Sequence, residues 1–198
     1  CEKSEGFTVG KKLKKLGDRS IDSAELIFHD FRVSGDNLSG GEEGTGFAQV
    51  AGGLELGRIN IAARGVGMAS GATKMSLAYA KDRKTFGKPI AEHQAIQLKL
   101  AEMSTRAEAS RLLVEQAALK FDKGERCDLE AGQAKFFASE AAVQNSLDGM
   151  RVFGGYSYSP EYEIERFYRD APLLCIGEGT NEIQRIIIAK QMIARSEC

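Results

Sequence analysis

Residues 175–185 read CIGEGTNEIQR and set Glu178 between two glycines, just before an apolar run with helical spacing. Thr180 is a favourable N-cap for a helix over residues 181–194, which carries Ile and Met on its apolar side. The stretch therefore predicts a loop that turns into the last helix of the fold. Because little side-chain bulk flanks Glu178, its carboxylate is well placed to reach into a pocket.

Upstream of this stretch, the sequence predicts three long helices over residues 47–82, 92–122 and 128–152. None contains proline, and each has apolar residues at helical spacing. We expect Asp128 to be the N-cap of the third helix, Gly154-Gly155 to end it, and a short helix to follow at 162–168. Antiparallel helices with short connections make a mainly α fold, an up-and-down helical bundle.

Residues 1–33 differ from the rest because they favour short strands, at Phe7-Thr8-Val9 and over 24–33. Apolar residues on both faces of the second strand predict that it is covered on both sides. A Gly-rich acidic linker follows, and we place the domain boundary there, with a β remnant at 1–36 and a four-helix-bundle domain at 37–198. The chain does not begin with methionine and opens in a strand region, so we expect a fragment or a processed piece.

The composition excludes several classes of function. The 27 Lys and Arg residues nearly balance the 28 Asp and Glu residues among 198, which disfavours nucleic acid or an anionic membrane as partner. Four widely spaced cysteines fit neither a zinc cluster nor a disulfide scaffold and favour a reducing, intracellular location. We expect no membrane span and no signal peptide. No metal is expected, since His29 and His93 are far apart in sequence.

Four further stretches carry a resemblance to a known family. They are RKTFGKPI at 83–90 with HQAIQ at 93–97, VFGGY at 152–156, RDA at 169–171 and EGTNEIQR at 178–185. In this order and spacing they resemble the C-terminal part of the acyl-CoA dehydrogenase flavoenzymes, and residues 1–36 look like the end of that family's middle β-domain. The resemblance implies that this portion alone, without the family's remaining flavin-binding wall, is inactive.

The resemblance implies a reaction, the FAD-dependent α,β-desaturation of an acyl-CoA thioester. Glu178 matches the family's base, which removes the α-proton, while flavin N5 accepts the β-hydride. Some relatives carry the base on the first long helix, immediately before an arginine. Here that position is Gly57, before Arg58, so the chain offers one candidate base.

Substrate contacts are implied at Glu55, Arg58 and Gly179. The resemblance places Glu55 and Arg58 beside the CoA portion of the substrate, where a guanidinium and a carboxylate can hold polar groups. From the residues alone, a solvated ion pair three residues apart on one helix face explains them equally well.

Cofactor contacts are implied at three places. The turn Arg83, Lys84, Thr85, Phe86, with His93 and Gln94, is implied to contact the FAD of a neighbouring subunit, which in turn implies a homo-oligomer, a dimer of dimers. Arg151, Gly154 and Gly155 are implied to approach the adenosine half of FAD. Thr180 and Glu182, which follow the base in sequence, are the third group of implied cofactor contacts. Read alone, the basic turn is more often solvent-exposed, and the glycine pair merely ends a helix.

The chain departs from common family patterns at three positions. Arg151 replaces a frequent glutamine, Gly177 a tyrosine before the base, and Ser157 a glycine in the Gly-Gly-Tyr loop. The first change bears on the cofactor contact. The second can widen the pocket around the base.

Two other functions stay open. One keeps the fold but changes the oxidant or substrate, as in the acyl-CoA oxidases or nitroalkane oxidases. The other is a non-catalytic helical oligomerisation module. For the leading hypothesis, a dehydrogenase of fatty acid β-oxidation, we expect an electron-transfer flavoprotein as acceptor and a bacterial cytoplasmic or mitochondrial matrix location.

Overall fold

The computed structural model describes residues 5–196 and divides into two units, with the boundary between Gly53 and Leu54. Each unit is described by itself. Within residues 5–196, no helix combines the length and the apolar character that crossing a membrane requires. The same residues contain no grouping of His, Cys, Asp and Glu that could hold a metal ion.

The first unit contains one antiparallel strand pair, β1 (Phe7–Lys12) and β2 (Ala24–Phe28). Phe7 lies opposite Phe28, and their rings stack with centroids 5.2 Å apart. Both predicted strands are present, but the second ends at Phe28 rather than Val33. Asp30 has a left-handed backbone (φ 48°), which is incompatible with an extended strand.

The prediction that this strand is covered on both sides is wrong. Leu26, Ile27 and Phe28 are 58%, 48% and 55% exposed. A two-stranded ribbon has no second layer to bury its faces, so apolar residues on both sides of the strand do not by themselves produce a core. The Gly-rich segment that follows holds one short 3-10 helix, η1 (Gly35–Asn37).

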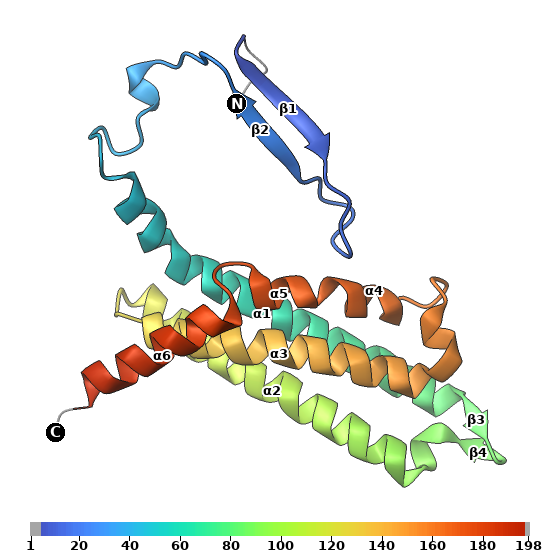
Figure 1. Ribbon diagram of the computed structural model, residues 1–198. Helices are drawn as coiled ribbons and strands as arrows, with labels where there is room; N and C mark the ends of the chain where they lie inside the picture. The colour runs from blue at the N-terminus through green and yellow to red at the C-terminus, as the bar shows by residue number, and fades with distance from the viewer. Residues whose placement is uncertain (1–4, 197–198) are drawn as a thin grey trace. The chain divides into compact units, whose positions relative to one another are not determined.

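Three long helices frame the second unit: α1 (Gly46–Asp82), which starts before the unit boundary, α2 (Gln94–Asp122) and α3 (Asp128–Phe153). Their ends lie within two residues of the predicted ends. Figure 1 shows them running alongside one another, with short connections between successive helices. The predicted mainly α, up-and-down arrangement is confirmed.

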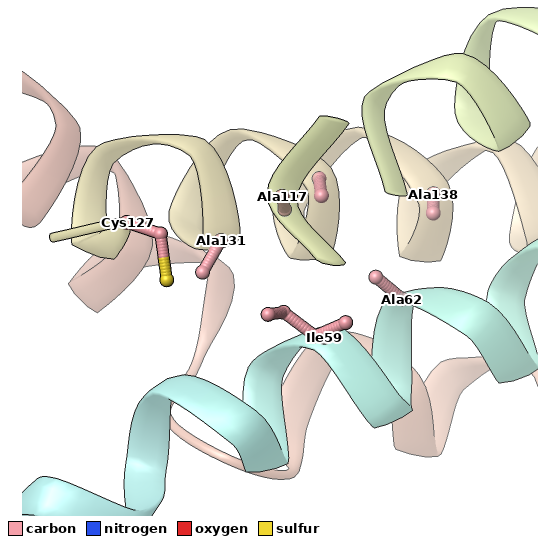
Figure 2. Close-up of a cluster of buried hydrophobic side chains, with 7 residues drawn as sticks. Ile59, Ala62, Ala117, Cys127, Ala131 and Ala138 are labelled. Atoms are coloured by element: carbon pink, nitrogen blue, oxygen red, sulfur yellow. The ribbon is translucent and has the colours of Figure 1, made fainter. Parts of the chain in front are cut away.

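Alanine dominates the core between these helices. Ile59 and Ala62 of α1 face Ala138 of α3, and Ala117 of α2 joins the same cluster (Figure 2). Small side chains at the inward positions let the helix backbones approach closely. Gly65 marks a close approach, because a Cβ there would stand 2.7 Å from the carbonyl oxygen of Ala138.

A buried polar network also joins the three helices. Asn145 of α3 is fully buried, and its amide donates to the carbonyl oxygens of Met103 (2.8 Å) and Ala69 (3.2 Å). Arg106 of α2 donates to the Asn145 side-chain oxygen over 2.7 Å and pairs with Asp148. Because each polar group is satisfied, the network fixes how the helices align.

The connection from α1 to α2 is a two-residue hairpin. Its strands are β3 (Lys84–Thr85) and β4 (Lys88–Pro89), and the 3-10 helix η2 (Ile90–Glu92) leads into α2. Phe86 and Gly87 form the tip, with φ values of 51° and 80°. Two positive φ angles are the geometry of a type I′ turn, which normally favours Asn-Gly.

The fourth helix of the bundle is divided among shorter ones that pack on α3. After η3 (Gly154–Tyr158) come α4 (Ile164–Asp170), α5 (Pro172–Ile176) and α6 (Asn181–Arg195). The helix predicted at 162–168 begins two residues later. The five-residue α5 was not predicted; its proline stands at the first helical position, where the missing N–H costs little.

The last helix begins as predicted. Thr180 is its N-cap, and the Thr180 hydroxyl accepts a hydrogen bond from the backbone N–H of Ile183. The side chains that α6 buries are polar, Asn181 and Gln184, whereas Ile183 and Ile193 are 47% and 73% exposed. The contact of α6 with α3 therefore combines these buried polar side chains with Ile188, whose Cγ1 would stand 3.3 Å from a Cβ built on Gly132.

The start of α3 differs from the prediction. Cys127, rather than Asp128, is the N-cap, and it makes no side-chain cap hydrogen bond. The Asp128 carboxylate instead pairs with Arg126 and with Arg195 near the end of α6. Burial would raise the pKa of the neighbouring Glu130, but ion pairs with Lys120 and Arg195 hold it below its usual value. Ion pairs thus tie the end of α6 to α3.

Candidate functional site

Glu178 lies in the loop between α5 and α6 with a strained backbone. Its φ is 55°, in the left-handed region, and Gly179 follows at 83°. A glutamate rarely adopts this conformation, which costs of order 1–3 kcal/mol and is most often found at functional sites. The surrounding contacts must therefore hold Glu178 in place.

The carboxylate of Glu178 lies directly against α1. A Cβ built on Gly57 would stand 2.4 Å from Oε2 of Glu178 and 2.8 Å from its Cδ. Only a residue without a side chain leaves room at position 57 for this arrangement. The tertiary structure thus brings together the two positions at which the resemblance would put a base.

Buried polar side chains of α3 and α6 hold the Glu178 loop through hydrogen bonds. Gln184 is fully buried, and its amide donates to the carbonyl oxygens of Glu178 and Gly179, both over 3.1 Å. Lys135 of α3 is also fully buried and donates to the Cys175 carbonyl (3.1 Å) and to Asn181 Oδ1 (2.8 Å). Burial lowers the pKa of Lys135, opposed by nearby acidic groups.

The sequence analysis missed these three anchors. Asn181 and Gln184 belong to the motif stretch at 178–185. Polar residues at the inward positions of the last helix could have indicated buried hydrogen bonds to the loop. Lys135 is a single cation in the alanine-rich run 131–142, which could have marked it as buried.

Glu55 and Arg58 stand on α1 beside Gly57. The Cys127 thiol donates to Glu55 Oε2 over 3.6 Å, and burial together with the Glu55 charge raises the pKa of Cys127 from 9.0 to about 11. Nε of Arg58 is buried without a hydrogen-bond partner. Among residues 5–196 no ion pair joins Glu55 to Arg58, so the two are not the solvated pair that the sequence left open.

A second group of predicted residues meets where the hairpin adjoins the end of α3. A cavity of about 540 Å³ opens there, and its lining includes Tyr79, Arg83, Thr85, Gly154 and Gly155. Burial raises the pKa of Tyr79, while the Arg83 charge opposes the shift. A guanidinium, a hydroxyl and exposed glycine backbone are groups suited to a phosphorylated ligand.

The hairpin tip is arranged around this cavity. The guanidinium of Arg83 lies 5.4 Å from the ring centroid of Tyr156. Thr85 Oγ1 and His93 Nε2 are 3.0 Å apart, and the Phe86 ring meets His93 edge-on at 6.2 Å. Phe86 itself is 98% exposed.

Other predicted cofactor residues lie elsewhere. Lys84 and Gln94 are exposed, and Arg151 pairs with Asp148 over 3.1 Å instead of lining the cavity. Glu182 lies in the first turn of α6, where its own backbone N–H and the Thr180 hydroxyl hold its pKa below the usual value.

The predicted site residues therefore form two groups at well-separated positions along α1. Gly57, under Glu178, and Tyr79, in the cavity, are 22 residues apart, or roughly 33 Å at 1.5 Å per residue. We call them the Glu178 end and the hairpin end. No side chain spans this distance, so one small chemical group cannot contact both ends at once.

Comparison with known families identifies the protein family of this chain. Residues 44–193 match the model for the acyl-CoA dehydrogenase C-terminal domain. The chain belongs to the acyl-CoA dehydrogenase family. A curated acyl-CoA dehydrogenase of Bacillus subtilis (strain 168) is 50% identical over 188 residues, which is 95% of this chain and 49% of the relative.

Solved structures agree with this assignment. Butyryl-CoA dehydrogenase from Megasphaera elsdenii superposes with a TM-score of 0.93 at 40% identity, over 97% of this chain and 50% of that one. A structure of the electron transferring flavoprotein of Acidaminococcus fermentans matches with the same TM-score, identity and coverage. The chain thus spans about half the length of the acyl-CoA dehydrogenases that it matches.

Proposed function

We propose that this chain is the C-terminal portion of an FAD-dependent acyl-CoA dehydrogenase, in which Glu178 removes the α-proton during α,β-desaturation of an acyl-CoA thioester. The observation that carries the proposal is the Glu178 carboxylate, held in a left-handed backbone against the bare backbone of Gly57. Strain of this kind is kept where geometry serves function.

Glu178 has the properties that a base needs in this reaction. Its side chain is exposed at the loop, so a substrate can reach it, while buried contacts fix the backbone beneath it. The carboxylate accepts the proton from the carbon next to the thioester, whose acidity the carbonyl increases. Arg58, with its unpaired buried Nε, and Glu55 lie one turn from Gly57 or less and are suited to polar groups of the CoA carrier.

The hairpin end is suited to the dinucleotide of FAD. Arg83 and Thr85 supply a charged and a neutral hydrogen-bond donor, and Gly154 and Gly155 leave the backbone open for close approach. The remaining proposed cofactor contacts lie outside this cavity lining and rest on the resemblance alone: Lys84, Phe86, His93, Gln94, Arg151, Thr180 and Glu182. When bound, the flavin supplies the acceptor for the β-hydride.

The separation of the two ends supports assembly into a homo-oligomer. If Glu178 and Gly179 work in the chain's own active site, a cavity roughly 33 Å away along α1 is better suited to the FAD of a neighbouring subunit. The exposed Phe86 at the hairpin tip fits such a contact. We propose a dimer of dimers on this basis.

An electron-transfer flavoprotein is the proposed electron acceptor. A structure of such a flavoprotein from Acidaminococcus fermentans is among those similar to this chain. The curated relative from Bacillus subtilis supports a bacterial cytoplasmic location, and a mitochondrial matrix location is the alternative.

The test is Glu178→Gln in the native holoenzyme, mixed anaerobically with acyl-CoA while flavin absorbance is followed. We expect FAD to stay bound and bleaching to be lost, because the amide cannot accept the α-proton. Glu161→Gln, at an exposed position, is the control and should bleach normally. Retained bleaching in Glu178→Gln would contradict the assignment of the base.

Two other outcomes separate the rival functions. Oxygen consumption and peroxide formation during turnover would identify an oxidase of the same fold. If the parent protein itself shows no bleaching with acyl-CoA, so that Glu178→Gln changes nothing measurable, the chain is a helical oligomerisation module instead.

A further inference from the structure

We propose that Lys135 is a positioning residue for Glu178, acting by clamping both ends of the loop that carries it. The inference rests on the proposed function, since it assigns a role in the reaction of Glu178. Lys135 lies behind the Glu178 end and bonds to the residues on either side of its loop, and none of the family motifs includes it. Its contacts are entirely internal.

The geometry of the clamp is specific. Cys175 lies near the end of α5 and Asn181 is the first residue of α6, so the five residues between them form the loop around Glu178. Nζ of Lys135 donates to the Cys175 carbonyl over 3.1 Å and to Asn181 Oδ1 over 2.8 Å. One ammonium group thus joins the end of one helix to the start of the next.

The clamp rests on a firm support. Lys135 stands within α3, the helix that packs against α2, α4, α5 and α6. Asn181, 2% exposed, is held further by its amide, which donates to Ser139 Oγ (3.0 Å) and Glu140 Oε1 (2.8 Å), both from α3. The Asn181 side chain, whose oxygen accepts a hydrogen bond from Lys135, is therefore held in a single orientation.

The burial of the Lys135 ammonium group requires a physical explanation. Removing a charged amine from water is unfavourable, and an apolar side chain of similar length would fill the same space without that cost. What the apolar side chain cannot do is bond to the unpaired carbonyl at the end of α5 and to the Asn181 side chain at once. The bonds of Lys135 therefore serve the loop rather than the packing.

The loop has the strain that such a clamp must oppose. Glu178 is left-handed, and between the two anchors the amide of Gln184 donates to its carbonyl oxygen. If the ends of the loop were free to separate, the backbone of Glu178 could relax toward an ordinary conformation and its carboxylate would leave Gly57. Displacements near 1 Å in a reacting group reduce rates by about 100-fold.

The experiment compares variants of the native holoenzyme by anaerobic stopped-flow reduction with acyl-CoA, which yields a limiting rate constant and an apparent dissociation constant. For Lys135→Met, which keeps the length but removes the donor, we expect the rate constant to fall about 100-fold. The apparent dissociation constant should change less than about threefold, and FAD content should not change. A purely structural role would not separate rate from binding in this way.

Asn145→Ala is the matched control. It removes another fully buried polar side chain of α3, ten residues or roughly 15 Å along the helix from Lys135, and so destabilises the fold without touching the loop. Its rate constant should stay within about threefold of the parent. An equal loss in Asn145→Ala and Lys135→Met would overturn the proposal, as would an unchanged rate in Lys135→Met.

A second variant keeps the test decisive if Lys135→Met fails to fold. Asn181→Ala removes one of the two acceptors and should lower the rate constant about tenfold; an unchanged rate would overturn the clamp. Failure of the proposed function is distinguishable, because it would appear as bleaching retained in Glu178→Gln. Failure of the clamp leaves Glu178→Gln inactive and Lys135→Met active.

Discussion

The Glu178 end and the hairpin end each contain a pair of residues with positive φ angles, in different settings. Glu178-Gly179 has φ values of 55° and 83°, and Phe86-Gly87 has 51° and 80°. In each pair a residue that disfavours the left-handed region precedes a glycine that accepts it, and in each pair the first side chain is exposed. The local conformation is nearly identical, but what holds it differs.

At the hairpin end, the conformation follows from the chain itself. A two-residue connection between paired strands favours the type I′ and II′ turns, and type I′ has positive φ at both positions, so the pairing of β3 with β4 favours this turn. At the Glu178 end, no strand pairing is involved, and side chains from α3 and α6 hold the loop. A strained residue can therefore be fixed by local geometry or by tertiary contacts, and only the second requires the whole bundle.

The largest predicted difference between the ends is catalytic. Glu178→Asn should lower the rate of anaerobic flavin reduction by about 1000-fold or more, because it removes the base, whereas Phe86→Asn should lower it less than about tenfold. Stopped-flow absorbance with acyl-CoA measures both. Similar losses in the two variants would mean that the ends share one chemical role.

Alkaline pH should act on the Glu178 end through Cys127. Its pKa is raised from 9.0 to about 11, so the unfolded thiol ionises first. Below pH 9 this contribution to stability is fully present, and roughly 2–3 kcal/mol of it is lost as pH rises through 11. Urea unfolding from pH 8 to 11 should show a shallower loss for Cys127→Ala than for the parent. Identical slopes would mean that Cys127 ionises normally.

The hairpin end should control cofactor content instead. Arg83→Ala should weaken FAD binding about 10- to 100-fold, because a charged hydrogen-bond donor is lost from the cavity. The flavin that remains should be reduced at the normal rate, since Glu178 is untouched. Lys81→Ala, an exposed cation near the end of α1, is the control. Unchanged FAD content and oligomeric state would contradict the cofactor role.

Gly57→Ala should show how tightly α1 fits Glu178. The added methyl group would stand 2.4 Å from Oε2, so the carboxylate must move, and we expect flavin reduction to slow about tenfold. Gly67→Ala tests the same change on the same helix, where no described atom lies within 4 Å of the new Cβ. The control should keep full activity and gain about 0.5–1 kcal/mol of stability.

The smallest predicted effect concerns strain itself. Asparagine tolerates the left-handed region better than glutamate or phenylalanine, so Glu178→Asn and Phe86→Asn should each stabilise the fold by about 0.5–1 kcal/mol. Thermal unfolding of both variants measures the gain. A gain only in Phe86→Asn would show that the clamped loop has already compensated the strain at Glu178.

Much of the fold was predictable from the sequence because its signals are local. Helical spacing without proline located α1, α2 and α3 to within two residues, and Thr180 was recognised as a cap from its hydroxyl and position. The prediction for Asp128 was wrong because a carboxylate at a helix start serves equally well in an ion pair, and Arg195, which competes for it, comes from the far end of the chain.

The candidate site was predictable only in part. Its motif residues could be named from the family pattern, but their division between two ends roughly 33 Å apart could not, because separation depends on which residues share a helix end after folding. The contact of Glu178 with Gly57 and the anchors at Lys135 and Gln184 join distant segments. These contacts depend on tertiary distances, which no local sequence pattern predicts.

The sequence by itself determined the three long helices, the N-cap of the last helix and the family, because helical periodicity, capping chemistry and motif order can be recognised along the chain. Only the tertiary structure decided that an exposed glutamate is held left-handed against a glycine of α1 by a buried lysine and a buried glutamine. Packing of the alanine-rich helices brings these groups within hydrogen-bond reach, and a contact between segments exists only once the bundle has closed.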